Sequence, residues 1–269
     1  MQQIPLSDFS SYLFDLDGTI YVGNRVLEGA ASTIEGLRER MKTVLFATNT
    51  TVYTREEVRD KLGRFGIACT AEEVITALSV AGMYFRNYAS GAKVLLLGDE
   101  AMREEMTRSG IAVTGEASHA THVLVGLDRT LDFDKLTAAV NAVRNGAFLI
   151  AANPDPYCPM EDGVIPDTWA LVKAIETAGN RLAHDTVGKP SGHYAAYALQ
   201  KLKSPPEQCL MVGDKLETDI MLGKSIGMRT ALVLSGVDSR ESVRSTGIHP
   251  DYICSSINDI LEETRLETI

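Results

Sequence analysis

The sequence predicts an α/β protein with a doubly wound, mainly parallel sheet and a second α/β domain inserted into it. Short apolar segments rich in leucine and β-branched residues alternate with segments of helical period, as in parallel sheets flanked by helices. Most apolar segments lack polar alternation, which is typical of strands buried on both faces. A long stretch between two polar strand ends leaves room for the inserted domain.

The predicted elements follow one another along the whole chain. The strands are apolar runs that end at a polar residue or a glycine, and they cover residues 11–15, 43–49, 93–98, 122–127, 147–153, 209–214 and 230–236. The helices have apolar residues three and four positions apart, and several end at glycine. They cover residues 28–41, 54–66, 132–146, 167–179 and 192–202.

Polar side chains follow three of the predicted strands at the point where each strand ends. In a doubly wound sheet, the carboxyl ends of neighbouring strands open into one crevice, where ligands bind. We therefore expect the residues at these strand ends to converge: Asp15 and Asp17, Thr48 and Asn49, and Asp214 with Asp219 a turn further on.

A fourth segment, "VGKPS", places Lys189 directly before a proline. Proline is favoured in the first turn of a helix, so we predict that a helix begins at Pro190. The ammonium of Lys189 and the N–H groups of that helix would then meet an anion together.

These residue types suit a metal and phosphate site. Asp15, Asp214 and a backbone carbonyl of the first loop offer the hard oxygen ligands that Mg²⁺ prefers. Lys189, Thr48 and Asn49 offer positive charge and hydrogen-bond donors to phosphoryl oxygens. Neighbouring carboxylates repel one another unless a cation lies between them or one carries a proton, so paired aspartates at one strand end also point to a bound cation.

Composition excludes several classes of protein. The formal charge of -10 over 269 residues disfavours nucleic acid and anionic membranes as partners. No apolar run reaches the length of a membrane span, and the N-terminal residues lack the features of a secretory signal, so a cytoplasmic location is expected. The four cysteines form no C-x-x-C pair, which argues against a zinc site. Association with further copies of the chain stays open.

Four short motifs in fixed order resemble the signature of the haloacid dehalogenase-like superfamily: "DLDGT", "ATN", "GKPS" and "GDKLETDI". The resemblance implies a Rossmann-like core in which Asp15 is the nucleophile. It further implies that Asp17 is the general acid and base and lends its carbonyl to Mg²⁺, that Asp214 is a metal ligand, and that Thr48 and Lys189 bind the phosphoryl group. We also assign Asn49 to the phosphoryl group and Asp219 to the metal.

The activity implied is Mg²⁺-dependent hydrolysis of a small phosphate monoester, such as a sugar phosphate or a nucleotide, through an aspartyl-phosphate. The dehalogenases of the superfamily are similar to one another in having a first motif without the second aspartate, because a departing halide needs no proton. Asp17 therefore argues for a phosphatase, whose partner is a small phosphorylated metabolite.

The spacing of the motifs locates the inserted domain. About 140 residues separate "ATN" from "GKP", which is far more than one helix and one strand need. We predict a catalytic core of residues 1–80 and 182–269 and an inserted α/β cap of residues 81–181. This arrangement resembles the NagD-like and p-nitrophenyl phosphatase branch, although Thr50 stands where many relatives have a second asparagine.

The segment "NPDPYCPMEDGVIPDTWA" is similar to part of the cap in that branch. Asn153, Asp155 and Tyr157 are therefore candidates to face the leaving group and set substrate specificity. N-P-D-P is also a good turn sequence without any contact to substrate, and both interpretations stay open.

Two other functions use similar residues. A receiver-like phosphoacceptor module also places aspartates, threonine and lysine around Mg²⁺, but it needs only ~120 residues and no cap, within the usual size of one domain. A catalytically silent binding protein on the same fold would most easily lose Asp15 or Asp17, and the chain has both. Release of phosphate from p-nitrophenyl phosphate distinguishes either alternative from a phosphatase.

Overall fold

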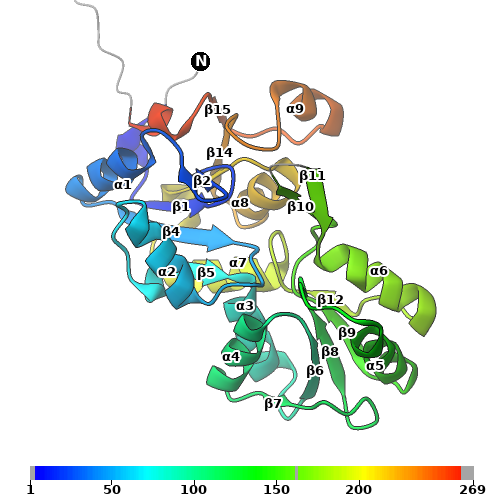
Figure 1. The fold of residues 1–269 in the computed structure, drawn as a ribbon. Coiled ribbons are helices and arrows are strands. Elements are labelled where there is room, and N and C mark those ends of the chain that lie inside the picture. Colours follow the sequence, from blue (N-terminus) through cyan, green and yellow to red (C-terminus); the bar gives the residue numbers. More distant parts are fainter. Residues whose placement is uncertain (1–3, 161–162, 262–269) are drawn as a thin grey trace, which may run out of the picture. The chain divides into compact units, whose positions relative to one another are not determined.

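The computed structural model (Figure 1) describes residues 4–160 and 163–261. The chain divides into two compact units. The first contains the residues up to Thr48, Arg59–Ile75 and the residues from Ala195 onward, and the second contains Asn49–Val58 and Thr76–Tyr194. The second unit thus includes the predicted cap segment, 81–181, together with residues on both sides of it and the segment that follows Thr48.

A six-stranded sheet forms the centre of the first unit, with strand order β15-β14-β13-β1-β4-β5. Its neighbours β15 to β4 pair in parallel, as the apolar runs predict. Every residue of β1 and of β13 is buried. The strands are β1 (Ser11–Asp15), β4 (Thr43–Thr48), β5 (Val74–Thr76), β13 (Cys209–Gly213), β14 (Arg229–Val233) and β15 (Tyr252–Cys254).

The register of this sheet brings three polar strand ends to one edge. Asp15 at the end of β1 is paired with Ala47 of β4, so Thr48 lies one residue beyond that pair. On the other side of β1, Phe14 is paired with Val212 of β13, so Asp214 comes directly after the strand. Parallel pairing alone therefore places Asp15, Thr48 and Asp214 at the carboxyl edge of the sheet.

Five α-helices accompany this sheet within the described residues. Helix α9 begins with a capping box between Ser239 and Ser242 and ends at Gly247, whose φ is 70°; glycine adopts this left-handed conformation at little cost. The helices are α1 (Ala30–Glu39), α2 (Arg55–Arg64), α7 (Gly192–Leu202), α8 (Met221–Ser225) and α9 (Arg240–Thr246). A π-helical turn, η4 (Leu216–Ile220), leads into α8.

Helix α7 begins at Gly192, as the predicted helical segment 192–202 does, and not at Pro190, as the position of the proline suggests. The hydroxyl of Ser191 accepts a hydrogen bond from the N–H of Tyr194 at 3.2 Å, which is the geometry of an N-cap residue. Ser191 therefore supplies the cap, and Lys189 precedes it by two residues.

The second unit has its own parallel sheet, with strand order β12-β9-β8-β6-β7. Leu95, Val123 and Leu149 from three of its strands pack with Val143 and Ile175 from two helices in one apolar core. The strands are β6 (Lys93–Leu97), β7 (Ala112–Val113), β8 (His122–Val125), β9 (Phe148–Ala151) and β12 (Asp185–Thr186), and the helices are α3 (Ala77–Tyr88), α4 (Glu100–Arg108), α5 (Phe133–Arg144) and α6 (Thr168–Gly179).

The described residues also form two antiparallel pairs of short strands. In the first unit β2 (Tyr21–Val22) pairs with β3 (Arg25–Val26), directly after the "DLDGT" turn. In the second unit β10 (Tyr157–Met160) pairs with β11 (Gly163–Pro166), between β9 and α6.

Across the described residues, none of the helices combines the length and the apolar character that a membrane crossing requires.

Candidate active site

Three buried carboxylates lie together at the carboxyl edge of the first sheet. Asp15 ends β1, Asp214 follows β13, and Asp219 lies in the η4 turn, with exposed fractions of 7%, 3% and 1%. One oxygen from each carboxylate lies within 4.8 Å of the others. Three ionised carboxylates so close together and so well buried would repel strongly, so the cluster is suited to a cation with hard oxygen ligands.

The carboxylate of Asp214 is held in one place by its neighbours. Its Oδ2 accepts a hydrogen bond from the N–H of Val237 at 2.7 Å. A Cβ atom at Gly18 would lie 2.2 Å from this oxygen, and one at Gly236 would lie 1.9 Å from it. Only glycine fits at these two positions, so the backbone can approach the carboxylate from both sides.

Asp219 is held in a similar way by the start of its own turn. The N–H of Lys215 donates to Asp219 Oδ2 at 3.1 Å. A Cβ atom at Gly213 would lie 2.3 Å from the Cβ of Asp219, so the end of β13 has to be glycine for the turn to pack against it. π-helical turns of this kind are frequent at functional sites.

The loop after β14 also belongs to this site, although none of its residues is among those predicted from the sequence. Ser235 donates from its hydroxyl to the carbonyl of Gly18 at 2.7 Å, and Asp238 accepts from the N–H of Leu216 at 2.7 Å. Segment 235–238 thus ties the "DLDGT" turn to the η4 turn. A signal was present, because the predicted strand 230–236 also ends in polar Ser235 and Gly236.

Asp17 lies in the turn after β1 and is exposed. Gly18 beside it has φ 86°, and its N–H donates to the carbonyl of Tyr21 at 2.8 Å. Asp17 itself forms an isolated bridge with Tyr21. Glycine is favoured after Asp17 because the chain has to turn there with a positive φ.

The second unit contains the buried lysine. Lys189 is 2% exposed, and its N–H donates to the side-chain oxygen of Asn49 at 2.7 Å. The Nδ2 of Asn49 donates to Lys189 O at 3.2 Å and to Asp155 Oδ2 at 2.9 Å. Asn153 in turn donates to the carbonyl of Asn49 at 2.9 Å. The carboxamide of Asn49 therefore joins the Lys189 loop to the segment after β9.

The structure collects the predicted residues in two groups. Within the first unit it brings Asp15, Asp214 and Asp219 together, with Thr48 at the same edge and 3% exposed. Within the second unit it links Asn49 with Lys189, Asn153 and Asp155, and Asp155 N–H also donates to Asn153 Oδ1 at 3.0 Å. Tyr157 is 49% exposed on β10.

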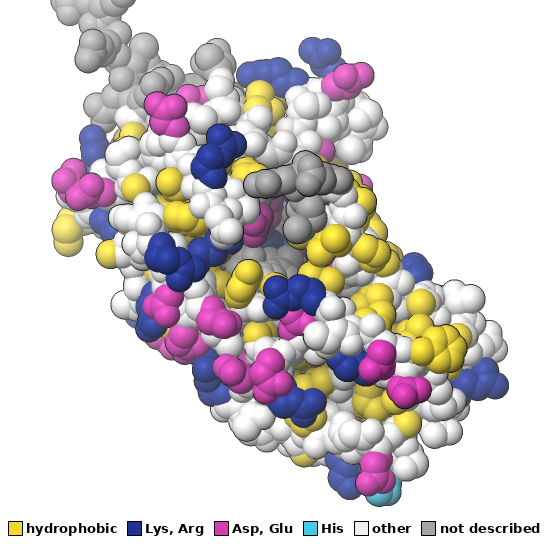
Figure 2. Space-filling view, in the orientation of Figure 1, with side chains coloured by type: hydrophobic (Ala, Val, Ile, Leu, Met, Phe, Trp, Pro, Cys, Tyr) yellow, Lys and Arg dark blue, Asp and Glu magenta, His cyan; other side chains and the backbone are white. Residues whose placement is uncertain are grey.

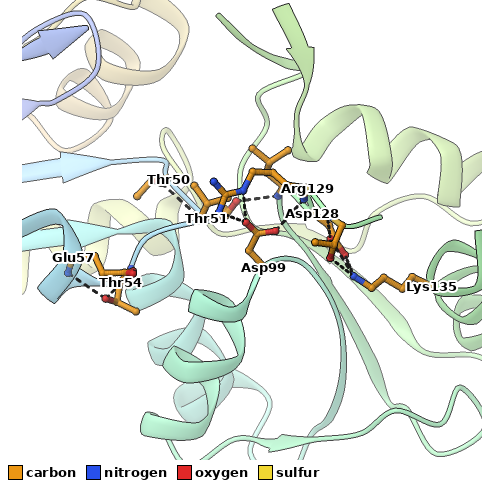
Figure 3. A network of polar contacts seen from close by, with 11 residues as sticks. Thr50, Thr51, Thr54, Glu57, Asp99, Asp128, Arg129 and Lys135 are labelled. Carbon is orange, nitrogen blue, oxygen red and sulfur yellow. Dashed lines mark hydrogen bonds and ion pairs between the residues drawn. The ribbon is translucent and has the colours of Figure 1, made fainter. Parts of the chain in front are cut away.

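A further polar network runs along the carboxyl edge of the second sheet (Figure 3). Thr51 accepts from the N–H of Leu127 at 2.9 Å. Asp99, which follows β6, accepts from the N–H of Arg129 at 2.9 Å and from its Nε at 2.5 Å. These bonds connect the segments that follow β6 and β8 at the carboxyl edge of this sheet.

Charges on the molecular face shown in Figure 2 are mixed. Blue Lys and Arg side chains are interspersed with magenta Asp and Glu side chains, and no broad field of one sign is present on that face. This face therefore offers no broad positive field to steer an anion.

The parallel sheet and its carboxylate cluster define an α/β protein with a site for a hard cation at the carboxyl edge. Family models of haloacid dehalogenase-like hydrolases match residues 12–112 and 186–260. The chain is 32% identical over 258 residues to an acid sugar phosphatase from Staphylococcus aureus, covering 96% of this chain and 99% of the relative. The chain therefore belongs to the haloacid dehalogenase-like hydrolases.

Solved structures place the chain more narrowly. A p-nitrophenyl phosphatase from Archaeoglobus fulgidus has a TM-score of 0.89 at 30% identity, covering 94% of this chain and 98% of that one. A glycerol phosphate phosphatase from Mycobacterium tuberculosis, in complex with calcium, has a TM-score of 0.86 at 30% identity, covering 95% and 75%. The expected NagD-like and p-nitrophenyl phosphatase branch is confirmed, and the chain is a phosphatase. Neither the receiver-like nor the silent alternative is supported.

Proposed function

We propose that this phosphatase hydrolyses small phosphate monoesters with Mg²⁺ and through an aspartyl-phosphate on Asp15. The observation that carries the proposal is the buried cluster of Asp15, Asp214 and Asp219, in which one oxygen of each carboxylate lies within 4.8 Å of the other two. The family to which the chain belongs generally uses a divalent metal. Asp15 also ends a fully buried strand, which is a rigid place for a nucleophile.

The donor set fits Mg²⁺. Asp15 and Asp214 would hold the ion with the backbone carbonyl of Asp17, and Asp219 would bind it directly or fix the ligands around it. All of these are oxygen ligands, and the glycines around Asp214 and Asp219 leave those carboxylates little freedom to move. When bound, the ion would offset negative charge on the phosphoryl oxygens and on the cluster.

The proposed reaction has two steps. In the first, a carboxylate oxygen of Asp15 attacks phosphorus, the ester P–O bond breaks, and Asp17 gives its proton to the departing oxygen. In the second, Asp17 takes a proton from water, the water oxygen bonds to phosphorus, and the bond from phosphorus to Asp15 breaks. Asp17 ends with its proton restored, so both the atoms and the protons balance.

Lys189 and Thr48 are proposed to bind the phosphoryl oxygens. The Lys189 side chain is nearly all buried, and a buried ammonium interacts more strongly with an anion than one in water. The carboxamide of Asn49 is engaged with Lys189 and Asp155. We therefore propose that Asn49 acts on the phosphoryl group by holding Lys189 in position.

The second unit is proposed to select the substrate. Its residues Asn153 and Asp155 lie in the same hydrogen-bond network as Lys189. Tyr157, two residues after Asp155, is exposed to solvent. Hydroxyl groups are the partners that such side chains recognise, and the named relatives include an acid sugar phosphatase and a glycerol phosphate phosphatase. A phosphorylated sugar or polyol is thus the proposed class, and the cytoplasm stays the predicted location.

Removal of the metal tests the proposed function directly. We expect release of nitrophenolate from p-nitrophenyl phosphate in Mg²⁺ buffer, its loss after dialysis against a chelator, and its return when Mg²⁺ is added. Asp219→Asn should weaken Mg²⁺ activation, whereas Glu217→Gln, an exposed residue of the same turn, should not. Full activity in the dialysed protein would contradict a metal-dependent mechanism.

Replacing Lys189 with methionine keeps the buried stem and removes the charge. We expect kcat/KM to fall about a hundredfold, or ~3 kcal/mol of transition-state stabilisation, because the ammonium is shielded from water. The matched control is Lys93→Met, at an exposed lysine of the same unit. A change in KM with unchanged kcat would show instead that Lys189 binds substrate and transition state equally.

A further inference from the structure

One lysine of the first unit contacts a residue of the turn that carries the proposed acid and has no part in the mechanism above. The ammonium of Lys61, on α2, lies 3.8 Å from the centroid of the Tyr21 ring. The centroid of the same ring lies 5.4 Å from that of Phe65, which follows Lys61 by four residues. Tyr21 is 3% exposed and Lys61 is half-buried, so this cation–π contact is largely shielded from water.

Tyr21 is also bound to the turn that carries Asp17. Its carbonyl accepts from the N–H of Gly18 at 2.8 Å, and its N–H donates to the carbonyl of Leu16 at 3.1 Å. Tyr21 thus holds the residues on both sides of Asp17. A contact that fixes the Tyr21 ring therefore also fixes the backbone from which the Asp17 side chain extends.

Asp17 also influences the pKa of Lys61. Burial lowers the pKa of the Lys61 ammonium, and the nearby Asp17 carboxylate acts in the opposite direction. Arg64, one turn along α2, lowers the same pKa by repulsion. The sign of the Asp17 effect is that of a carboxylate attracting an ammonium, which agrees with the shared contact of both residues with Tyr21.

We propose that Lys61 is a positioning residue, which rests on the Tyr21 ring and orients the carboxyl group of Asp17 for proton transfer. An ammonium donates hydrogen bonds and accepts none, so it attracts a carboxyl oxygen that carries no proton. The proton of Asp17 then lies on the other oxygen, where the departing ester oxygen can take it. This inference rests on the proposed function, because it assigns a role only if Asp17 is the acid.

The test uses the dependence of the rate on the leaving group. An alkoxide needs a proton as it departs and nitrophenolate does not, so a misplaced acid slows formation of the aspartyl-phosphate, the step that kcat/KM reports, only with alkyl esters. For Lys61→Met we expect kcat/KM to fall about tenfold or more with glycerol phosphate and to change less than about threefold with p-nitrophenyl phosphate. Lys61→Arg keeps the charge and the ring contact and should restore most of the activity with glycerol phosphate.

The controls separate this role from a merely structural one. Arg64→Met removes a positive charge from an exposed position in the same last turn of α2 and should leave both rates unchanged. In an Asp17→Asn background, Lys61→Met should add no further loss with glycerol phosphate, because the two residues act as a unit. Circular dichroism and thermal unfolding confirm that each variant is folded.

The outcomes distinguish the two proposals. An equal fall with both esters in Lys61→Met, or no fall with either, would overturn the positioning role while the phosphatase mechanism stands. An additive loss in the double variant would overturn it too. Absence of any turnover in the wild-type protein with Mg²⁺ would overturn the proposed function and this inference with it.

Discussion

Replacing Asp15 with asparagine is expected to abolish turnover. The amide keeps the shape of the side chain but is not a nucleophile, so no aspartyl-phosphate forms. We expect kcat to fall by roughly four orders of magnitude or more, as in enzymes that lose their nucleophile. The measurement is phosphate release from p-nitrophenyl phosphate at saturating Mg²⁺ and high protein concentration.

The fold should survive this change. Asp15 is one of three buried carboxylates that repel one another in the absence of a cation, so its neutralisation should not lower the unfolding temperature of the metal-free protein. Asp8→Asn, at an exposed aspartate of the same unit, is the matched control and should keep full activity. If folded Asp15→Asn retained activity within about tenfold of wild type, Asp15 would not be the nucleophile.

Replacing Asp17 with asparagine is expected to slow the hydrolysis of alkyl esters and of aryl esters to different extents. For glycerol phosphate, formation of the phosphoenzyme should slow by about two to four orders of magnitude, the usual contribution of a general acid. For p-nitrophenyl phosphate, the first step should suffer much less, because nitrophenolate departs without a proton. Hydrolysis of the aspartyl-phosphate still lacks its base with either substrate.

The Asp17 variant should therefore show a burst of nitrophenolate near one per chain, followed by slow turnover. Its affinity for Mg²⁺ should change little, since Asp17 is proposed to offer the metal its backbone carbonyl. Rapid-quench kinetics measures both phases. Equal slowing of the first step for both esters, without a burst, would show that Asp17 is not the acid.

Much of the first unit follows from pattern and pairing. Strands such as 11–15 and 209–213 are apolar throughout and buried throughout, so their identity needs no tertiary information. Parallel pairing then brings their carboxyl ends to one edge, so the approach of Asp15 and Asp214 is predictable from the strand ends, and Asp219 joins them from the turn that follows.

Other elements depend on contacts that the sequence does not display. Helix α3 was missed because residues 77–85 are all buried, and a short, nearly continuous apolar run fits a buried strand as well as a buried helix. Helix α4 was missed because it has only nine residues, of which Ala101, Met102 and Met106 are apolar, so its apolar side is short.

The site residues that were missed or reinterpreted act through the backbone. Ser235 and Asp238 bond to main-chain groups of distant turns, so the polar end of the predicted strand 230–236 marks the loop but does not identify these partners. The carboxamide of Asn49 binds the Lys189 backbone across a separation of 140 residues. The helix after Lys189 begins at Gly192 and not at Pro190, because the hydroxyl of Ser191 supplies the cap.

Detection of the covalent intermediate tests the central claim most directly. Asp17→Asn is mixed with p-nitrophenyl phosphate and Mg²⁺, quenched in acid during the burst, digested and mapped by mass spectrometry. The mechanism predicts one phosphoryl group per chain, on Asp15, labile to hydroxylamine as an acyl phosphate is, and absent from Asp15→Asn. A burst without bound phosphate, or a phosphoryl group on another residue, would contradict it.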